Sequence, residues 1–545
     1  MEEKNIISYL AALETVPMFL LFIVPLLFLF LLSRFQHKPY LPGPKGWPLI
    51  GNMAMMEQLT HRGLANLAKQ YGGMFHLRMG SQHIVVVSNS DISRQILQVQ
   101  DNIFSNRPVT VAIRYLTCGR ADMVFAQCGP FWRQMRKLCV MKLFSRKRVE
   151  SLHSVRDEVD QMIRIVATKT GTPVNIGELV FEITTNIIYR AAFGGRSSHQ
   201  MQDEFLKILQ EFSKLFGAFN IVDFIPWLGW IDPQGINNRL FKARASLDGF
   251  IDSIIDDHIQ KKDPTNGLNE AKRDMVDELL EFYSDENKVS VLRELDNSIK
   301  LTRNNIKAII MLSKITYLIS FTLYSLVFSL QFFILHSSDV MFGGTEAVAS
   351  AVEWVMAELM RNPEELKKVQ QELVNTVGLS RKVEESDLEK LTYLRCCIKE
   401  VLRLHPPIPL LLHQNAGAVV VADYLVPPKS LVLINVWAIG HDSNTWGDPD
   451  SFKPSRFMKD GVPDFKGNDF EFIPFGSGRR SCPGMQLALY EMDMVLAHLL
   501  HCFSWELPDG MKPSELDMDD VFGLTVPRAT RLVALPSPRL SCPLF

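Results

Sequence analysis

Charged side chains are absent from one long stretch near the start of the chain. Val16 to Leu32 consists almost entirely of aliphatic residues and phenylalanine, with glutamates before it and Arg34 and Lys38 after it. Such a run is just long enough to cross a bilayer, and its basic flank predicts that the following residues stay in the cytoplasm. A cleaved signal peptide would carry its basic residues before the apolar run. Residues 1–33 are therefore expected to form a membrane anchor.

Proline and glycine dominate the next stretch. Residues 39–48 read PYLPGPKGWP, a composition that excludes both an α-helix and a central β-strand. Prolines also stiffen a connecting segment. We expect residues 34–48 to form a hinge that holds the folded body, residues 49–545, at a fixed attitude to the membrane.

The body shows helical periodicity over most of its length. From about residue 90 to 410, apolar positions recur at helical spacing, and Asn362-Pro363 marks the start of one helix. Strand-like runs are short and occur at residues 74–78, 84–87 and 431–436. The pattern predicts a mainly α fold with a small β part.

Composition narrows the classes of function. Lys plus Arg is 58 and Asp plus Glu is 60, for a formal net charge of −2, so a nucleic-acid-binding surface is not expected. Hydrophobic residues at 47% and charged residues at 22% exclude a disordered chain. The eight cysteines include no CxxC pair, which argues against a disulfide scaffold or a zinc ribbon and favours a reducing compartment.

The most informative segment surrounds one cysteine. Residues 475–484 read FGSGRRSCPG and fit the pattern FxxGxRxCxG at Phe475, Gly478, Arg480, Cys482 and Gly484. Glycines let the backbone approach a flat cofactor and aim N–H groups at one sulfur, which would lower the pKa of the thiol. Arg480 suits a carboxylate, and the Pro-Gly pair suits the start of a helix. A buried structural cysteine would explain neither the glycines nor the arginine.

This segment resembles the cysteine loop of the cytochrome P450 family, and other motifs of the family are present. Trp132 and Arg136 match WxxxR, Glu400 and Arg403 match ExxR, and Arg456 matches a later arginine element. The pair Glu358 and Arg361 also fits ExxR. The later pair is preferred because Leu-His-Pro-Pro follows it, as in the family.

The resemblance implies the P450 fold and a haem b cofactor with Cys482 as the axial ligand of the iron. A thiolate ligand favours O–O cleavage. The other expected cofactor-binding residues are Trp132, Arg136, His413, Phe475, Arg480 and Gly484, of which Trp132, Arg136 and His413 would lie near the haem propionates. A buried charge cluster is expected from Glu400, Arg403 and Arg456.

A narrower resemblance is to the plant phenylpropanoid ring hydroxylases. It rests on DFIPWLGW at 223–230, LPDGMKP at 507–513 and FGLT at 522–525. It implies an enzyme of the endoplasmic reticulum membrane that uses O₂ and electrons from NADPH, delivered by a membrane reductase. The substrate would be ferulate, coniferaldehyde, coniferyl alcohol or a related cinnamaldehyde of lignin-type biosynthesis.

The segment expected to activate oxygen departs from the family pattern. It reads GGTEA at 343–347, so Gly343, Gly344 and the acid Glu346 are present, and we expect these three to be the catalytic residues. Ala347 stands where the family usually has threonine. Thr345 lies about 200° away along a helix and cannot replace that hydroxyl. This departure leaves a haem-thiolate isomerase or dehydratase as an alternative to a monooxygenase.

An apolar insert at residues 312–338 is the second departure. Its central part, 315–335, carries no charge, and hydropathy alone predicts a second membrane span. Such a span would put Trp132 and Cys482 on opposite sides of the bilayer, although both are expected at one haem. Our hypothesis is a retained intron in the gene structure. A real insertion and a non-functional membrane protein are the alternatives.

Basic residues gather around the Trp132 motif. They are Arg133, Lys137, Lys142, Arg146, Lys147 and Arg148. A solvated charged face is the usual interpretation of such a run. The functional interpretation is a docking surface for an acidic reductase, because the family receives its electrons on the cysteine side of the haem.

Overall fold

The computed structural model describes residues 41–117, 119–120, 122–146, 149, 153–193, 215, 220–260, 274–280, 341–523 and 525–544. The α-helices in these ranges are α2 (His61–Tyr71), α3 (Ser90–Arg94), α4 (Asp101–Phe104), α5 (Val111–Leu116), α6 (Pro130–Lys142), α8 (His153–Thr168), α9 (Ile176–Phe193), α11 (Ile236–Gln260), α12 (Met275–Leu280), α14 (Met341–Arg361), α15 (Pro363–Val377), α16 (Glu385–Leu388), α17 (Thr392–Leu404), α18 (Val436–Gly440) and α19 (Met485–Cys502).

The strands form three small sheets. They are β1 (Met74–Met79), β2 (Gln82–Val87), β3 (Val174–Asn175), β4 (Leu410–Gln414), β5 (Val419–Val421), β6 (Tyr424–Val426), β7 (Leu431–Asn435), β8 (Phe503–Glu506) and β9 (Val533–Pro538). The largest sheet has the order β1-β2-β7-β4, in which only the β2–β7 pair is parallel. The others have the orders β3-β9-β8 and β5-β6.

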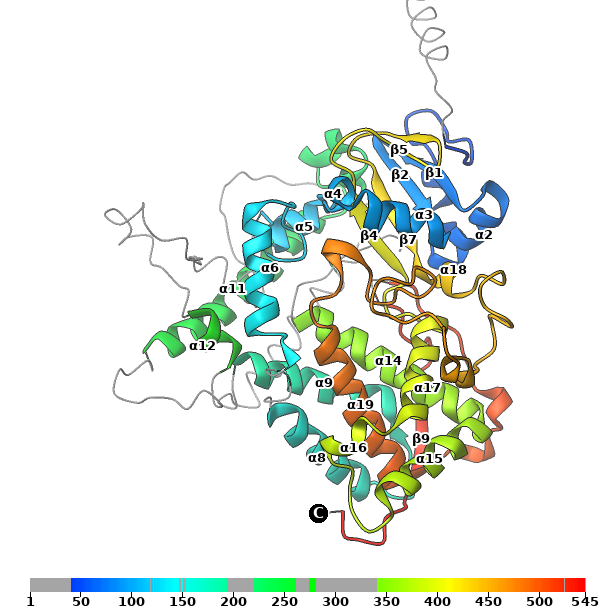
Figure 1. Cartoon of the computed structure of the whole chain (residues 1–545). Coiled ribbons are helices and arrows are strands. Elements are labelled where there is room, and N and C mark those ends of the chain that lie inside the picture. The colour runs from blue at the N-terminus through cyan, green and yellow to red at the C-terminus, as the bar shows by residue number, and fades with distance from the viewer. Residues whose placement is uncertain are drawn as a thin grey trace, which may run out of the picture.

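Helix α14 lies at the centre of the helical part and contacts α9, α17 and α19 (Figure 1). Its small and apolar residues explain this position, since Val352, Val355 and Met356 have no exposed surface. At Gly344 an added Cβ would lie 3.0 Å from Ile188 Cδ1 of α9, so the missing side chain allows the two helices to approach closely. The four-stranded sheet lies to one side, with α2, α3 and α18 around it (Figure 1).

The mainly α fold with a small β part is confirmed. The hairpin β1–β2, strand β7 and the start of α15 at Pro363 lie where the sequence predicts them. Asn362 is the N-cap residue, but its side chain makes no capping bond and donates instead to the carbonyl of Glu358 at 2.9 Å. The α15 start therefore depends on proline at the first helical position rather than on an asparagine cap.

Part of the predicted hinge belongs to the folded body. Leu41 is buried, and the carbonyl of Pro42 accepts a hydrogen bond of 2.8 Å from the N–H of His76 in β1. Within the described ranges, no helix is both long and apolar enough to cross a bilayer. The predicted anchor at 1–33 and the insert at 312–338 lie outside the described residues.

Candidate functional site

A cavity lies between α14 and the cysteine loop. Ile188 of α9, Val348 and Ala351 of α14, and Leu411 of β4 contribute to its apolar lining. The lining also contains these predicted site residues: Arg136, Gly344, His413, Phe475, Arg480, Cys482 and Gly484. The fold thus brings the WxxxR arginine, the α14 glycine and the cysteine loop to one internal space.

A tight loop presents Cys482 to this cavity. The N–H of Cys482 donates to the carbonyl of Phe475 at 2.8 Å, and α19 begins directly after Gly484. Gly478 has φ +67°, and an added Cβ there would lie 2.2 Å from the carbonyl oxygen of Leu97. Only glycine fits this turn, which explains its place in the motif.

The Cys482 side chain lines the cavity. Among the described cysteines it alone is exposed, whereas the others are buried or half-buried. Desolvation inside the protein raises the pKa of the Cys482 thiol, and the N–H groups of Gly484 and Met485 and the charge of Arg136 only partly oppose this. The N–H donors that the motif supplies therefore lower the pKa as expected, and desolvation opposes them more strongly.

Two arginines join the cysteine loop to the rest of the cavity wall. Arg136 of α6 donates to the carbonyl of Ser481 at 2.7 Å. Arg480 donates to the carbonyls of Ser105 at 2.8 Å and Met123 at 3.1 Å. In this structure Arg480 therefore binds backbone carbonyls, whereas the motif suggested a carboxylate.

The ring of Trp132 packs against the guanidinium group of Arg480. The guanidinium carbon of Arg480 lies 4.3 Å from the centroid of the Trp132 ring, and the indole N–H donates to the carbonyl of Met123 at 2.9 Å. This contact is a cation–π interaction. The described contacts of Trp132 thus fix the arginine, while its expected bond to a haem propionate stays a prediction.

His413 of β4 is a neutral group in the cavity wall. Desolvation, followed by the charge of Arg107, holds the pKa of His413 well below its usual range. Its Nδ1 lies 3.0 Å from the carbonyl oxygen of Phe104. A protonated Nδ1 would donate to this carbonyl, which leaves Nε2 as the free acceptor of the neutral ring.

The structure brings together the three residues of the expected charge cluster. Glu400 and Arg403 on α17 have no exposed side-chain surface. Both Glu400 oxygens accept from Arg403, at 2.8 and 2.9 Å, and Oε1 also accepts from Arg456 at 2.9 Å. The competing ExxR pair is not formed in this way, since Glu358 instead meets His405 at 2.7 Å. The carboxylate shared by two guanidinium groups fixes α17 to the segment before the cysteine loop.

The start of α14 has one face towards the cavity. Gly344, Ala347 and Val348 line the cavity, whereas Thr345 is fully buried elsewhere. Gly343 lies within α14 one residue earlier. The prediction that Thr345 cannot take over the missing hydroxyl of position 347 agrees with this geometry.

Two residues of this region were missed by sequence reasoning. Thr525 donates from its hydroxyl to Glu346 Oε2 at 3.1 Å. Glu491 of α19 lines the cavity, is fully buried, and neither of its carboxyl oxygens has a hydrogen-bond partner among the described residues. Desolvation raises the pKa of Glu491 well above its usual range, so it is a neutral acid. An isolated glutamate in an apolar helix carries no motif, so no signal in the sequence pointed to it.

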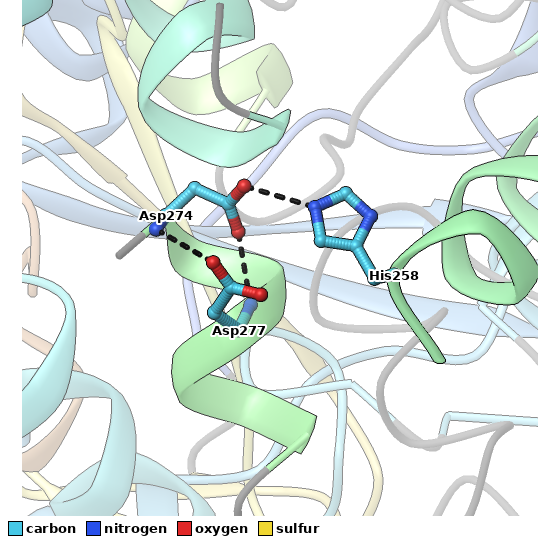
Figure 2. Close-up of side chains that lie close together, drawn as sticks. All are labelled: His258, Asp274 and Asp277. Carbon is cyan, nitrogen blue, oxygen red and sulfur yellow. Dashed lines mark hydrogen bonds and ion pairs between the residues drawn. The ribbon is translucent and has the colours of Figure 1, made fainter. Parts of the chain in front are cut away.

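His258, Asp274 and Asp277 form a group of potential metal ligands (Figure 2), and none of the three lines the cavity. His258 Nε2 is 2.9 Å from Asp274 Oδ2. Asp274 and Asp277 each accept from the other's backbone N–H, at 2.9 and 3.3 Å. This reciprocal bonding starts helix α12, and the histidine ties it to α11. The group therefore has a structural explanation.

Comparison with known proteins decides the family. The sequence profile described as Cytochrome P450 matches residues 41–313 and 329–533. Cytochrome P450 84A1 of Arabidopsis thaliana is 62% identical over 530 residues, which is 96% of each chain. This chain belongs to the cytochrome P450 family. Flavonoid 3'-monooxygenase of Petunia hybrida is 36% identical and covers 94% of this P450 and 95% of its own length.

The solved structure of a zebrafish cytochrome P450 with progesterone shares the fold. It covers 88% of this P450 and 99% of its own chain with a TM-score of 0.68, at 23% sequence identity. The chain is accordingly a cytochrome P450 monooxygenase that uses haem iron and electrons from NADPH supplied by a reductase.

The cavity fits this cofactor. Cys482 offers the single exposed sulfur of the described cysteines to the cavity, and thiolates are preferred ligands of haem iron in this chemistry. Arg136 and Arg480 add positive charge to the same wall, which suits the carboxylates of a haem. The apolar side chains around them suit its flat ring system.

Proposed function

We propose that this P450 hydroxylates the aromatic ring of a phenylpropanoid such as ferulate, coniferaldehyde, coniferyl alcohol or a related cinnamaldehyde, as a step of lignin-type biosynthesis. The observation that carries the proposal is the apolar wall of the cavity at Ile188, Val348 and Ala351. Such a wall suits an apolar substrate body such as an aromatic ring. The name of the Petunia relative, flavonoid 3'-monooxygenase, supports an aromatic substrate class.

Each part of the cavity would have a separate task in this reaction. Haem bound through Cys482 supplies the chemistry of dioxygen cleavage and insertion of one oxygen atom. Gly344 and Ala347 leave space next to α14, because neither has a side chain beyond Cβ. Glu346 would pass protons through water towards that space. The arginines and His413 would hold the propionate side of the cofactor.

Turnover of a small panel of compounds tests the substrate class. The enzyme, with reductase and NADPH, is expected to convert ferulate, coniferaldehyde or coniferyl alcohol to products heavier by one oxygen atom. A straight-chain fatty acid of similar volume is expected to react far more slowly, because it lacks the flat ring that the wall accommodates. Preferential turnover of the fatty acid, measured by mass spectrometry, would contradict the proposed substrate class.

We further propose that residues 1–33 anchor the enzyme in the endoplasmic reticulum membrane with the catalytic domain in the cytoplasm. Exposed apolar side chains support contact of the catalytic domain with a membrane surface: Leu49 is 89%, Trp227 71% and Trp230 83% exposed. Their segments meet at the β1–β2 turn, where Gly80 N–H donates to the carbonyl of Ile50 and Ser81 N–H to that of Phe224. Exposed tryptophans suit a membrane–water interface.

Tryptophan fluorescence measures this contact in the full-length enzyme. With brominated lipids in nanodiscs, quenching of the native enzyme is expected to fall strongly in the variant Trp227→Ser with Trp230→Ser. Trp505→Phe removes a buried tryptophan of β8 and should leave the lipid quenching unchanged. Equal quenching in the double variant and the native enzyme would exclude contact of this surface with lipid.

The reductase would dock on the exposed face of α6. Arg133 and Lys137 are exposed there, whereas Arg146 just beyond it pairs with Glu389 at 2.8 Å. Lys147 and Arg148 lie outside the described residues. Since Arg136 of the same helix contacts the cysteine loop, electrons arriving at this face would reach the cysteine side of the cofactor.

We also propose that residues 312–338 derive from a retained intron. The family profile leaves residues 314–328 unmatched, which supports extra residues at this point. Deletion of 312–338 is expected to increase the amount of haem bound per protein, because apolar side chains exposed to water cost about 25 cal/mol per Å². The reduced carbon monoxide spectrum measures the bound haem. Equal haem content before and after deletion would contradict the intron hypothesis.

A further inference from the structure

The segment Thr525–Val526 forms hydrogen bonds along one face of α14. Thr525 donates to Glu346 Oε2 at 3.1 Å, while Ser350 Oγ and Trp354 Nε1 donate to the carbonyl of Val526 at 3.1 and 3.0 Å. Residues 346, 350 and 354 are four apart and share one face of the helix. The N–H of Val526 also donates to the carbonyl of Pro407 at 3.0 Å, and Pro407 lines the cavity. The segment therefore links α14 to the cavity wall.

The face that Thr525 contacts lies beside the cavity face of α14. Ala347 lines the cavity. Glu346 does not line it, and lies about 100° from Ala347 but about 200° from Gly344 around the helix. Ala347 has no hydroxyl to offer a proton or to orient the acid next to it. Thr525, which is 9% exposed, brings a hydroxyl to the carboxylate of Glu346 from a distant part of the sequence.

We propose that Thr525 is a positioning residue that holds the Glu346 carboxylate in one orientation and so aligns proton delivery in an enzyme that lacks a hydroxyl at position 347. The inference rests on the proposed proton-transfer role of Glu346. A hydroxyl that donates to a carboxylate restricts the rotation of the acid. It thereby fixes the carboxylate oxygen that exchanges a proton with water.

Proton delivery decides between two balanced outcomes of NADPH oxidation. In the productive reaction, substrate, one dioxygen, one NADPH and one proton give hydroxylated product, one water and NADP⁺. In the unproductive reaction, one dioxygen, one NADPH and one proton give hydrogen peroxide and NADP⁺, and the substrate is unchanged. A misaligned Glu346 therefore lowers the product formed per NADPH and raises the peroxide released.

The test compares variants of similar shape in the full-length enzyme with reductase. Thr525→Val, which removes the hydroxyl but keeps the side-chain volume, is expected to lower product per NADPH several-fold and to change the solvent isotope effect on turnover. Thr525→Ser is expected to keep native values. Ser350→Ala removes a different hydroxyl that binds the same segment and should leave both measurements unchanged. The carbon monoxide spectrum verifies equal haem content in all variants.

Two results overturn the proposal. Native product per NADPH in Thr525→Val would show that the hydroxyl is not needed, and an equal loss in Ser350→Ala would reduce its role to packing of the segment. Glu346→Gln separates this proposal from the role on which it rests. If Glu346→Gln keeps native coupling, the proton-transfer role of Glu346 is wrong. If Glu346→Gln uncouples the enzyme and Thr525→Val does not, only the role of Thr525 is wrong.

Discussion

Substitution of Cys482 by serine is expected to abolish the thiolate signature in the reduced carbon monoxide spectrum and the monooxygenase activity. Serine has nearly the same shape, so the loop held by the Cys482 N–H bond to Phe475 should persist. The hydroxyl is a poor substitute for the thiolate, whose electron donation to iron favours O–O cleavage. The loss should therefore affect the chemistry more than the fold.

Cys542→Ser is the matched control, because Cys542 is a half-buried cysteine near the C-terminus and does not line the cavity. It should retain both the spectrum and the activity. Circular dichroism of the Cys482 variant verifies that the helices remain. A Cys482→Ser enzyme with the native spectrum and native turnover would show that another residue ligates the iron.

Glu400→Gln is expected to destabilise the enzyme severely. The change keeps the shape of the side chain but leaves two guanidinium groups, Arg403 and Arg456, facing a neutral amide where Glu400 has no exposed surface. Removal of one partner of a buried ion pair costs about 3–5 kcal/mol. Against a typical free energy of unfolding of about 5–15 kcal/mol, this is a large fraction. Urea denaturation followed by circular dichroism measures it.

Glu364→Gln supplies the comparison on an exposed ion pair. Glu364 meets Lys367 at 2.9 Å with both side chains largely in solvent, where the pair contributes little because water screens it. The free energy of unfolding of this variant should stay near the native value. If Glu400→Gln were as stable as Glu364→Gln, the charge cluster would have no structural role.

Much of the fold follows from local patterns, but strand β9 does not. The β1–β2 hairpin was predictable because both strands and their turn are adjacent in sequence. Strand β9 was not, since Pro536 and Pro538 argue against a strand. The structure tolerates them because β3 pairs with β9 only at Val533 and Ala534, so the edge beyond that point needs no further donors.

The site likewise contains residues that a local motif predicts and residues that meet only in the folded protein. The cysteine loop is a contiguous motif, and its glycine at 478 is required by one tight turn. The contact between Thr525 and Glu346 joins residues 179 positions apart and has no local pattern. The motif contains the N–H donors that lower the pKa of Cys482, whereas the desolvation that opposes them comes from the folded surroundings and has no local pattern.

Isotopically labelled dioxygen tests whether this P450 inserts an oxygen atom from O₂ into the aromatic ring of a phenylpropanoid. The full enzyme is incubated with reductase, NADPH and ferulate, coniferaldehyde or coniferyl alcohol, and the products are examined by mass spectrometry and nuclear magnetic resonance. One labelled oxygen atom is expected in the product, bound to the aromatic ring. A product without the label, or with the label only in the side chain, would contradict the proposed reaction.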